Sequence, residues 1–337
     1  MYYNTVPKWY RMFRYPLMAS GFYIQNLAKL TISKYTKRNV ALDHAKKTCA
    51  AVGRPFLSNE KFNTEIKRKI SSGNPFFCCR YGNSELTACF YSLLRKYNIL
   101  DCINPKLLKT AKTGPGVFPE DERIYLKFAD TYMAALGNAD MNAYWGSVLM
   151  EEYMIGRMMR KDCLQYAMRA LEPFQYEEPW TMALEGKNVL VVHPFAELIV
   201  EQYQRRDQIF PKKKILPNCN LKVVKALQSS GETIPSEYAN WNEALDALYE
   251  RCMEQSFQVA LLACGSYAVP LASRLKDAGK QVIVLGGMMQ LMFGIKGARW
   301  EASRPDIVAM YNDAWVRAGA ADRVKNADKM VDGAAYW

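Results

Sequence analysis

Short apolar runs alternate with longer amphipathic segments along most of the chain. A run of four consecutive apolar residues, 189–192, predicts a strand that is buried on both faces, as in a parallel sheet. Other runs are long enough for a strand but too short for a buried helix. Further strands are predicted at residues 75–79, 141–145, 221–224, 257–263 and 281–285.

Helical patterns separate these strands. Ser58 precedes a charged amphipathic segment with Glu60 in its first turn, which is typical of a capped helix start. Residues 257–285 read as a strand, a helix and a second strand joined by glycine turns, which predicts a βαβ unit of parallel sheet. Helices are predicted at residues 59–72, 86–94, 119–136, 148–159, 196–205, 240–254, 267–278 and 288–295.

These patterns predict an α/β fold, a Rossmann-like and mostly parallel sheet with helices on both faces. With 337 residues, half of them hydrophobic, the chain can bury one large domain with or without an appendage. Its nine cysteines are scattered and contain no CxxC pair, which favours a reducing compartment over disulfides or a thiolate zinc site. Two distant histidines exclude a histidine-rich metal site.

The positive charge is concentrated at one end. Of a net charge of +12, residues 1–50 contribute nine basic side chains and one aspartate, so the remaining body is nearly balanced. A nucleic-acid binder would more often spread this charge over a folded face, so no nucleic-acid partner is predicted. In this aromatic, helical arm Tyr23, Leu27 and Leu30 share one helical face, which suits either an interfacial helix on anionic lipid or a helix packed on the body or a partner.

Candidate binding groups follow the strand at residues 75–79. Arg80 could bind a phosphate, and Asn83 and Glu85 could offer two oxygens to one cation. In an open α/β sheet, ligands bind beyond the carboxyl ends of the strands, which is where these residues fall. The alternative is that Asn83 or Ser84 caps the next helix while Glu85 favours its positive end.

Other strand ends carry candidates of the same kind. Backbone amides at Gly265, Gly286 and Gly287 could approach a ligand closely. His193 comes at the end of the strand, directly after the apolar run 189–192. It could bind a diphosphate or act as a general base, or it could instead cap backbone groups. Glu197 follows in the first turn of the next helix. The loop at residues 113–116 lacks the Lys-Ser/Thr of a Walker A loop, and the GxGxxG fingerprint of dinucleotide folds is absent.

Taken together, these motifs resemble those of the GT-D-type glycosyltransferases. The segment from Arg80 to Glu85 is similar to the Arg-x-Gly-Asp-x-Glu signature of that family, with Asn83 at the position of the aspartate. The resemblance covers approximately residues 56–337 and leaves the basic arm outside. Its further motifs are residues 179–180, 186–195, 263–267, 286–290, 293–300, 312–316 and 336–337.

The resemblance implies a GT-D-like domain at residues 51–302, flanked by the arm, 1–50, and a wrapping extension, 303–337. It also implies transfer of a sugar from a nucleotide diphosphate donor to a glycan or lipid-linked acceptor in bacterial surface-polysaccharide or glycoconjugate synthesis. The alternative is a non-catalytic sugar-nucleotide-binding or assembly subunit. We expect a cytoplasmic protein that the arm holds at the inner membrane face.

The implied site has three parts. Glu85, His193 and Glu197 are the candidate catalytic residues. Asn83 and Glu85 would bind a divalent cation, Mn²⁺ or Mg²⁺, although Asn83 brings no charge to it. The candidate donor-binding residues are Arg80, Gly82, Gly265, Ser266, Gly286, Gly287, Gln290 and Lys296.

Overall fold

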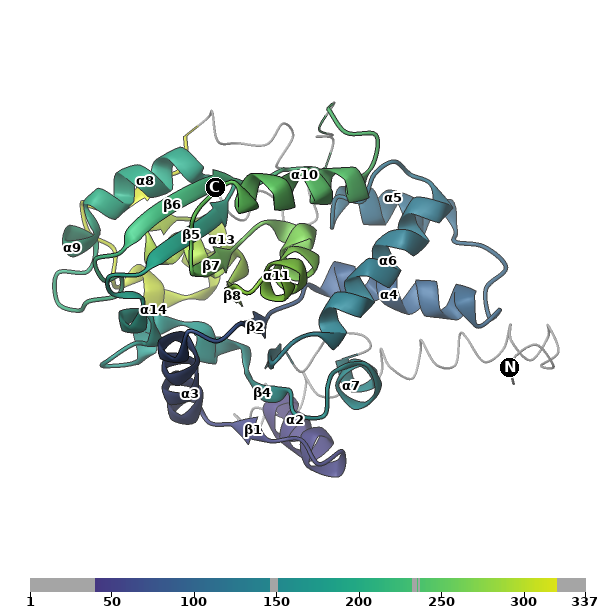
Figure 1. The fold of residues 1–337 in the computed structure, drawn as a ribbon, viewed down its shortest axis with the longest axis horizontal. Helices are drawn as coiled ribbons and strands as arrows, with labels where there is room; N and C mark the ends of the chain where they lie inside the picture. The colour runs from purple at the N-terminus through teal and green to yellow at the C-terminus, as the bar shows by residue number, and fades with distance from the viewer. Residues whose placement is uncertain (1–39, 146–150, 232–234, 236, 320–337) are drawn as a thin grey trace.

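The computed structural model describes residues 40–145, 151–231, 235 and 237–319, and these residues form an eight-stranded sheet (Figure 1). Every pairing in it is parallel. The predicted α/β fold with a parallel sheet is therefore confirmed. From one edge to the other the strands are β1 (Phe56–Leu57), β4 (Leu164–Ala167), β3 (Met141–Tyr144), β2 (Phe76–Cys79), β8 (Gln281–Val284), β7 (Val259–Leu262), β5 (Asn188–His193) and β6 (Asn220–Lys225).

Helices cover both faces of the sheet because alternate strand residues point to opposite sides. Phe77 and Cys79 of β2 join one apolar core, whereas Phe76 and Cys78 join the other. The first core is covered by α2 (Val40–Ala51), α4 (Asn83–Lys96), α5 (Pro105–Thr113), α6 (Glu122–Gly137), α10 (Trp241–Met253) and α11 (Ala268–Asp277). The second is covered by α3 (Asn59–Ser72), α8 (Ala196–Gln204), α9 (Arg206–Ile209), α12 (Met289–Met292), α13 (Ala298–Ser303) and α14 (Pro305–Val308).

Most predicted elements lie where the patterns place them. Ser58 caps α3, because its hydroxyl accepts a hydrogen bond from the Lys61 N–H at 3.3 Å. The helix predicted at residues 148–159 appears in the described part as a short helix, α7 (Glu151–Tyr153), and a π-helical turn, Met154–Met158. Strands β1 and β4 were not predicted. β4 has no apolar run because its buried Gln165 is polar and accepts a hydrogen bond from Asn142 of β3.

At the carboxyl-terminal edge of the sheet, neighbouring strands are followed by loops that lead to opposite faces. After β2 the chain turns to the first face and forms α4, whereas after the neighbouring β8 it turns to the second face and forms α12. Adjacent loops that diverge in this way leave a crevice at the carboxyl ends of the strands. The chain diverges again between β7, which leads to α11, and β5, which leads to α8.

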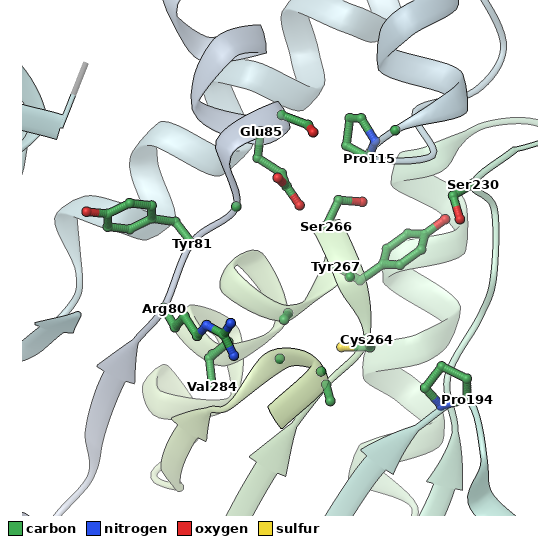
Figure 2. A pocket seen from close by; sticks show the side chains of 18 of the residues that line it. Arg80, Tyr81, Glu85, Pro115, Pro194, Ser230, Cys264, Ser266, Tyr267 and Val284 are labelled. Atoms are coloured by element: carbon green, nitrogen blue, oxygen red, sulfur yellow. The ribbon is translucent and has the colours of Figure 1, made fainter. Parts of the chain in front are cut away.

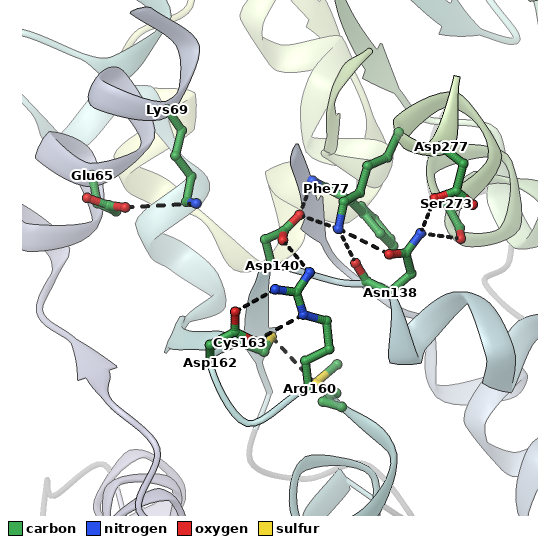
Figure 3. Close-up of polar contacts among 12 residues, drawn as sticks. Glu65, Lys69, Phe77, Asn138, Asp140, Arg160, Asp162, Cys163, Ser273 and Asp277 are labelled. Carbon is green, nitrogen blue, oxygen red and sulfur yellow. Dashed lines mark hydrogen bonds and ion pairs between the residues drawn. The ribbon is translucent and has the colours of Figure 1, made fainter. Parts of the chain in front are cut away.

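A polar cluster links the amino-terminal ends of the central strands, at the edge of the sheet opposite the crevice (Figure 3). The Asp140 carboxylate, just before β3, accepts hydrogen bonds from the backbone N–H of Phe77 and from Arg160, at 2.8 and 3.0 Å. Lys276 of α11 lies 2.8 Å from the same carboxylate and donates to the Asn138 carbonyl. These bonds fix β2, β3 and α11 relative to one another.

The ends of the chain are only partly described. Residues 1–39, with the predicted interfacial residues Tyr23, Leu27 and Leu30, and residues 320–337 lie outside the described part. Helix α2 buries Ala45 and Cys49 in the first core. After α14, β10 (Val316–Arg317) pairs with β9 (Ile295–Lys296). Among the described helices, none has both the length and the apolar character to cross a membrane.

Candidate functional site

A cavity of about 480 Å³ lies at the carboxyl ends of the strands (Figure 2). Its walls come from the loops after β2, β5, β6, β7 and β8, with the residue after β3 and the loop at residues 113–115 adding to them. This volume is typical of a small-molecule site. The convergence of several loops at one edge of the parallel sheet, which the sequence predicted, is present in the structure.

Arg80 directly follows β2 and faces this cavity (Figure 2). Its guanidinium donates a hydrogen bond to the Leu285 carbonyl at the end of β8 and lies 6.0 Å from the centre of the Trp145 ring. The side chain is half-buried, and the two contacts hold it at the β2–β8 opening. A guanidinium has five N–H donors in a planar fork that matches the oxygens of a phosphate.

The predicted cation-binding pair lies at the first turn of α4. Gly82, and neither Asn83 nor Ser84, occupies the N-cap position, and no side chain caps the helix there. Asn83 is exposed, whereas the half-buried Glu85 carboxylate folds back against Gly82, where a built Cβ would overlap it. Both residues line the cavity.

The fit of a divalent cation to these groups is limited. Among the described residues, no three His, Cys, Asp or Glu side chains lie close enough together to hold a metal ion. Glu85 is the sole acidic side chain among the described residues that line the cavity. Mg²⁺ is often bound by one or two carboxylates together with substrate phosphates. The donor set therefore suits an ion that a diphosphate carries, and it does not make a dedicated metal cage.

The predicted glycine turns also line the cavity. Gly265 and Gly286 have φ values of +58° and +60°, in the left-handed region that favours glycine. No atom lies within 4 Å of a Cβ built at Gly265, so this position is open, and Gly287 lines the cavity beside Gly286. Ser266 lies next to Gly265 and is only 2% exposed.

His193 lines the cavity but is already engaged. Its Nδ1 atom accepts a hydrogen bond from the backbone N–H of Phe195 at 3.0 Å. Complete burial lowers the pKa of the imidazole to about 3, so the ring is neutral near pH 7. With Nδ1 as the acceptor, the proton of the neutral ring is on Nε2. The backbone-capping alternative thus fits this contact, and the ring has no vacant nitrogen to act as a general base.

Two predicted residues lie outside the cavity lining, and a third lines it with its amide hydrogen-bonded to the backbone. Glu197 is exposed, pairs with Lys225 of β6 at 3.0 Å, and does not line the cavity. The ammonium group of Lys296 lies 5.2 Å from the centre of the Tyr311 ring, also outside the lining. Gln290 lines the cavity, and its amide donates to the Lys296 carbonyl at 3.1 Å.

Several residues of the cavity were not among the predicted site residues. Arg299 adds a second basic side chain, and Trp145 and Tyr132 add aromatic surface. Ser229 comes from the loop after β6, where its hydroxyl lies 2.8 Å from that of Tyr267. Trp145 is the last residue of a predicted strand, so its position at a strand end could also have marked it as a candidate.

Comparison with known proteins gives similarity in structure only. No protein-family model and no curated protein matches the sequence. One similar solved structure is described as "The highly conserved domain of unknown function 1792 has a distinct glycosyltransferase fold", with 11% identity over 82% of this chain and 95% of that chain, and a TM-score of 0.42. A selenomethionine-substituted structure of the same domain has 12% identity, the same coverages and a TM-score of 0.41.

Proposed function

We propose that the protein is a glycosyltransferase that transfers a sugar from a nucleoside diphosphate donor. The observation that carries this proposal is the position of Arg80, whose guanidinium is held at the β2–β8 opening beside the glycine turn at Gly286. A fixed cation next to accessible backbone amides suits a diphosphate.

The charges of the cavity support an anionic ligand. Its described lining has two guanidinium groups, Arg80 and Arg299, and one carboxylate, Glu85. When the glycosidic bond to the donor breaks, negative charge develops on the departing diphosphate. Groups that already point at this charge lower the barrier most, because they need no reorganisation during the reaction. Arg80 and the amides at Gly286 and Gly287 would have this role.

Glu85 is the candidate for proton transfer. It is the single carboxylate in the described lining, and it lies on the wall formed by α4 (Figure 2). In this role the carboxylate would take a proton from the attacking hydroxyl of the acceptor. His193 is less suited, because its Nδ1 atom accepts from Phe195 and its pKa is far below 7.

A divalent cation, if the donor brings one, would neutralise charge on the diphosphate. Glu85 and Asn83 are the residues that would contact it, because both line the cavity at the start of α4. We further propose an acceptor that is a glycan or a lipid-linked sugar, with the basic arm at residues 1–50 holding the protein at the inner face of a bacterial membrane during surface-polysaccharide synthesis.

Isothermal titration with UDP, GDP, ADP, CDP and their common sugar conjugates, with and without Mn²⁺, tests the proposal. We expect at least one nucleotide to bind the wild type, and Arg80→Ala to weaken that binding at least tenfold. Arg274→Ala is the matched control, since Arg274 pairs with Asp246 on the surface, away from the cavity. A folded wild type that binds none of these nucleotides would overturn the proposal.

A second candidate function is supported by Asn83. At the position where the family signature has an aspartate, this neutral side chain removes one of two expected carboxylates. The protein would then bind a sugar nucleotide without transferring its sugar, as a subunit of a polysaccharide-synthesising assembly. Tight binding of a sugar nucleotide, with neither hydrolysis nor transfer to any acceptor over hours, would favour this function over catalysis.

A further inference from the structure

The indole ring of Trp241 is fixed on several sides at the start of α10. It is fully buried and stacks on Tyr267, with ring centres 5.0 Å apart and an interplanar angle of 5°. It also makes an edge-to-face contact with Phe128, with ring centres 4.7 Å apart. Its backbone N–H donates to the Phe118 carbonyl at 2.8 Å. With the ring and the backbone both held, the indole N–H has a single direction.

That N–H points at Ser266. The Trp241 Nε1–H group donates to the Ser266 Oγ atom at 2.9 Å. An indole N–H can only donate, so the serine oxygen must be the acceptor, and the hydrogen of its hydroxyl is left for another partner. Among the described residues, no acceptor for that hydrogen is found, and Ser266 lines the cavity.

The surroundings of Ser266 favour an anionic partner. Ser266 lies in the turn that leads into α11, where backbone N–H groups carry partial positive charge. The adjacent Gly265 is exposed, and the space above its Cα atom is open, so a ligand can approach closely. Hydrogen bonds to charged oxygens are stronger than those between neutral groups, so a phosphate oxygen is the acceptor that gains most here.

We propose that Trp241, which lies outside the cavity, is a positioning residue whose indole N–H orients the Ser266 hydroxyl as a hydrogen-bond donor to the diphosphate of the ligand. This inference rests on the proposed function, which supplies the diphosphate. Trp241 itself touches no ligand. Without its N–H, the Ser266 hydroxyl would be free to rotate and would no longer be held in the donating direction.

Titration of UDP, or of whichever nucleotide from the panel binds most tightly, tests the inference in a double-mutant cycle. Trp241→Phe keeps an aromatic ring and removes the N–H, and we expect it to weaken binding three- to tenfold. Ser266→Ala should weaken binding at least as much. Since both changes remove the same bond, the double variant should bind no more weakly than Ser266→Ala alone.

Trp180→Phe is the matched control for loss of a buried indole bond. Trp180 is also fully buried, and its Nε1–H donates to the Leu171 carbonyl at 3.0 Å, on the other face of the sheet and outside the cavity lining. We expect its nucleotide affinity to equal that of the wild type. Melting temperatures of all four variants separate effects on folding from effects on binding.

A spectroscopic readout covers the case in which Trp241→Phe does not fold. In the wild type, the indole ¹H–¹⁵N resonance of Trp241 should shift when the nucleotide saturates the site, and in Ser266→Ala it should shift much less. Unchanged affinity in a folded Trp241→Phe, additive losses in the double variant, or an indole resonance that does not move would each overturn the inference while leaving nucleotide binding intact. Failure of every nucleotide to bind the wild type would overturn the proposed function together with it.

Discussion

The guanidinium of Arg80 lies so close to Gly286 that no side chain fits between them. A Cβ atom built at Gly286 would be 2.8 Å from the Arg80 Nη1 atom, and the φ of +60° at this glycine is unfavourable for other residues. These two residues lie at the ends of β2 and β8, the adjacent strands from which the chain leaves in opposite directions. The pair therefore defines the opening in which we place the diphosphate.

Gly286→Ala should move Arg80 and so weaken nucleotide binding about tenfold. It should also lower the free energy of unfolding by about 1–2 kcal/mol, because alanine is strained at positive φ. Gly279→Ala is the matched control, since Gly279 has a φ of +84° but no atom within 4 Å of a built Cβ. Urea denaturation should show a similar decrease in the free energy of unfolding for both variants. Equal nucleotide affinity in both would contradict the role assigned to Arg80.

Gly82→Ala should displace the Glu85 carboxylate without straining the backbone. The φ of Gly82 is −103°, which alanine adopts easily, and the built Cβ overlaps only the flexible end of Glu85. We expect the melting temperature to fall by only about 2 °C, because alanine at an N-cap costs about 1 kcal/mol relative to glycine. Sugar transfer or donor hydrolysis should fall at least tenfold. A variant as active as the wild type would rule out Glu85 as the base.

Acid should destabilise the protein through His193. Its pKa in the folded state, about 3, lies below the ordinary value of 6.5, so the unfolded chain binds a proton first as the pH falls. Between pH 6.5 and 3 this group therefore lowers the free energy of unfolding by up to about 1.4 kcal/mol per pH unit. Urea denaturation at pH 7, 6 and 5 gives the free energy of unfolding at each pH. This free energy should fall less steeply with decreasing pH in His193→Gln than in the wild type. Parallel slopes would show that the imidazole charges in the folded protein.

Asp140→Ala should destabilise the fold without changing the chemistry of the cavity. It leaves the Lys276 ammonium and the Phe77 N–H without their carboxylate (Figure 3), which we expect to lower the free energy of unfolding by about 3 kcal/mol. Asp162→Ala breaks only the exposed bond to Arg160 and should cost about 0.5 kcal/mol. Chemical denaturation of the two variants measures the difference in unfolding free energy. Equal losses would contradict the role of Asp140 in holding β2, β3 and α11 together.

Asn83→Asp should increase the effect of Mn²⁺ on nucleotide binding. The change adds a second carboxylate beside Glu85, and hard cations prefer charged oxygen ligands. We expect Mn²⁺ to tighten UDP binding about tenfold more in this variant than in the wild type. Asn59→Asp places the same charge at the first residue of α3 and controls for the helix dipole. A Mn²⁺ effect that is equal in all three proteins would exclude a cation at Asn83.

Sequence patterns identified the strands that are buried on both faces, because such strands are continuous apolar runs. They therefore placed Arg80, His193 and Gly286 correctly at one edge of the sheet. They missed β4, where buried Gln165 satisfies its polar group with Asn142 across the sheet. No run of residues along the chain indicates such a pairing.

Three contacts made by candidate residues could not be predicted from the sequence. The hydrogen bond from the Phe195 backbone N–H to His193 Nδ1 depends on the local path of the turn. The pairing of Glu197 with Lys225 depends on β6 lying beside β5. Likewise, Trp241 reaches Ser266 only because α10 packs beside α11. These three contacts limit what the candidate residues can bind, and the last two require the assembled fold.

The pairing of β2 with β8 has a consequence for synthesis on the ribosome. Phe76, Phe77 and Cys78 pair with Gln281, Val282 and Ile283, more than 200 positions later in the chain. Until β8 emerges, the central strand β2 has an open, apolar edge, the kind of surface on which other chains aggregate. The nascent protein is therefore without a binding cavity until nearly all of its sequence has been translated, and any product that terminates before residue 281 retains the exposed edge.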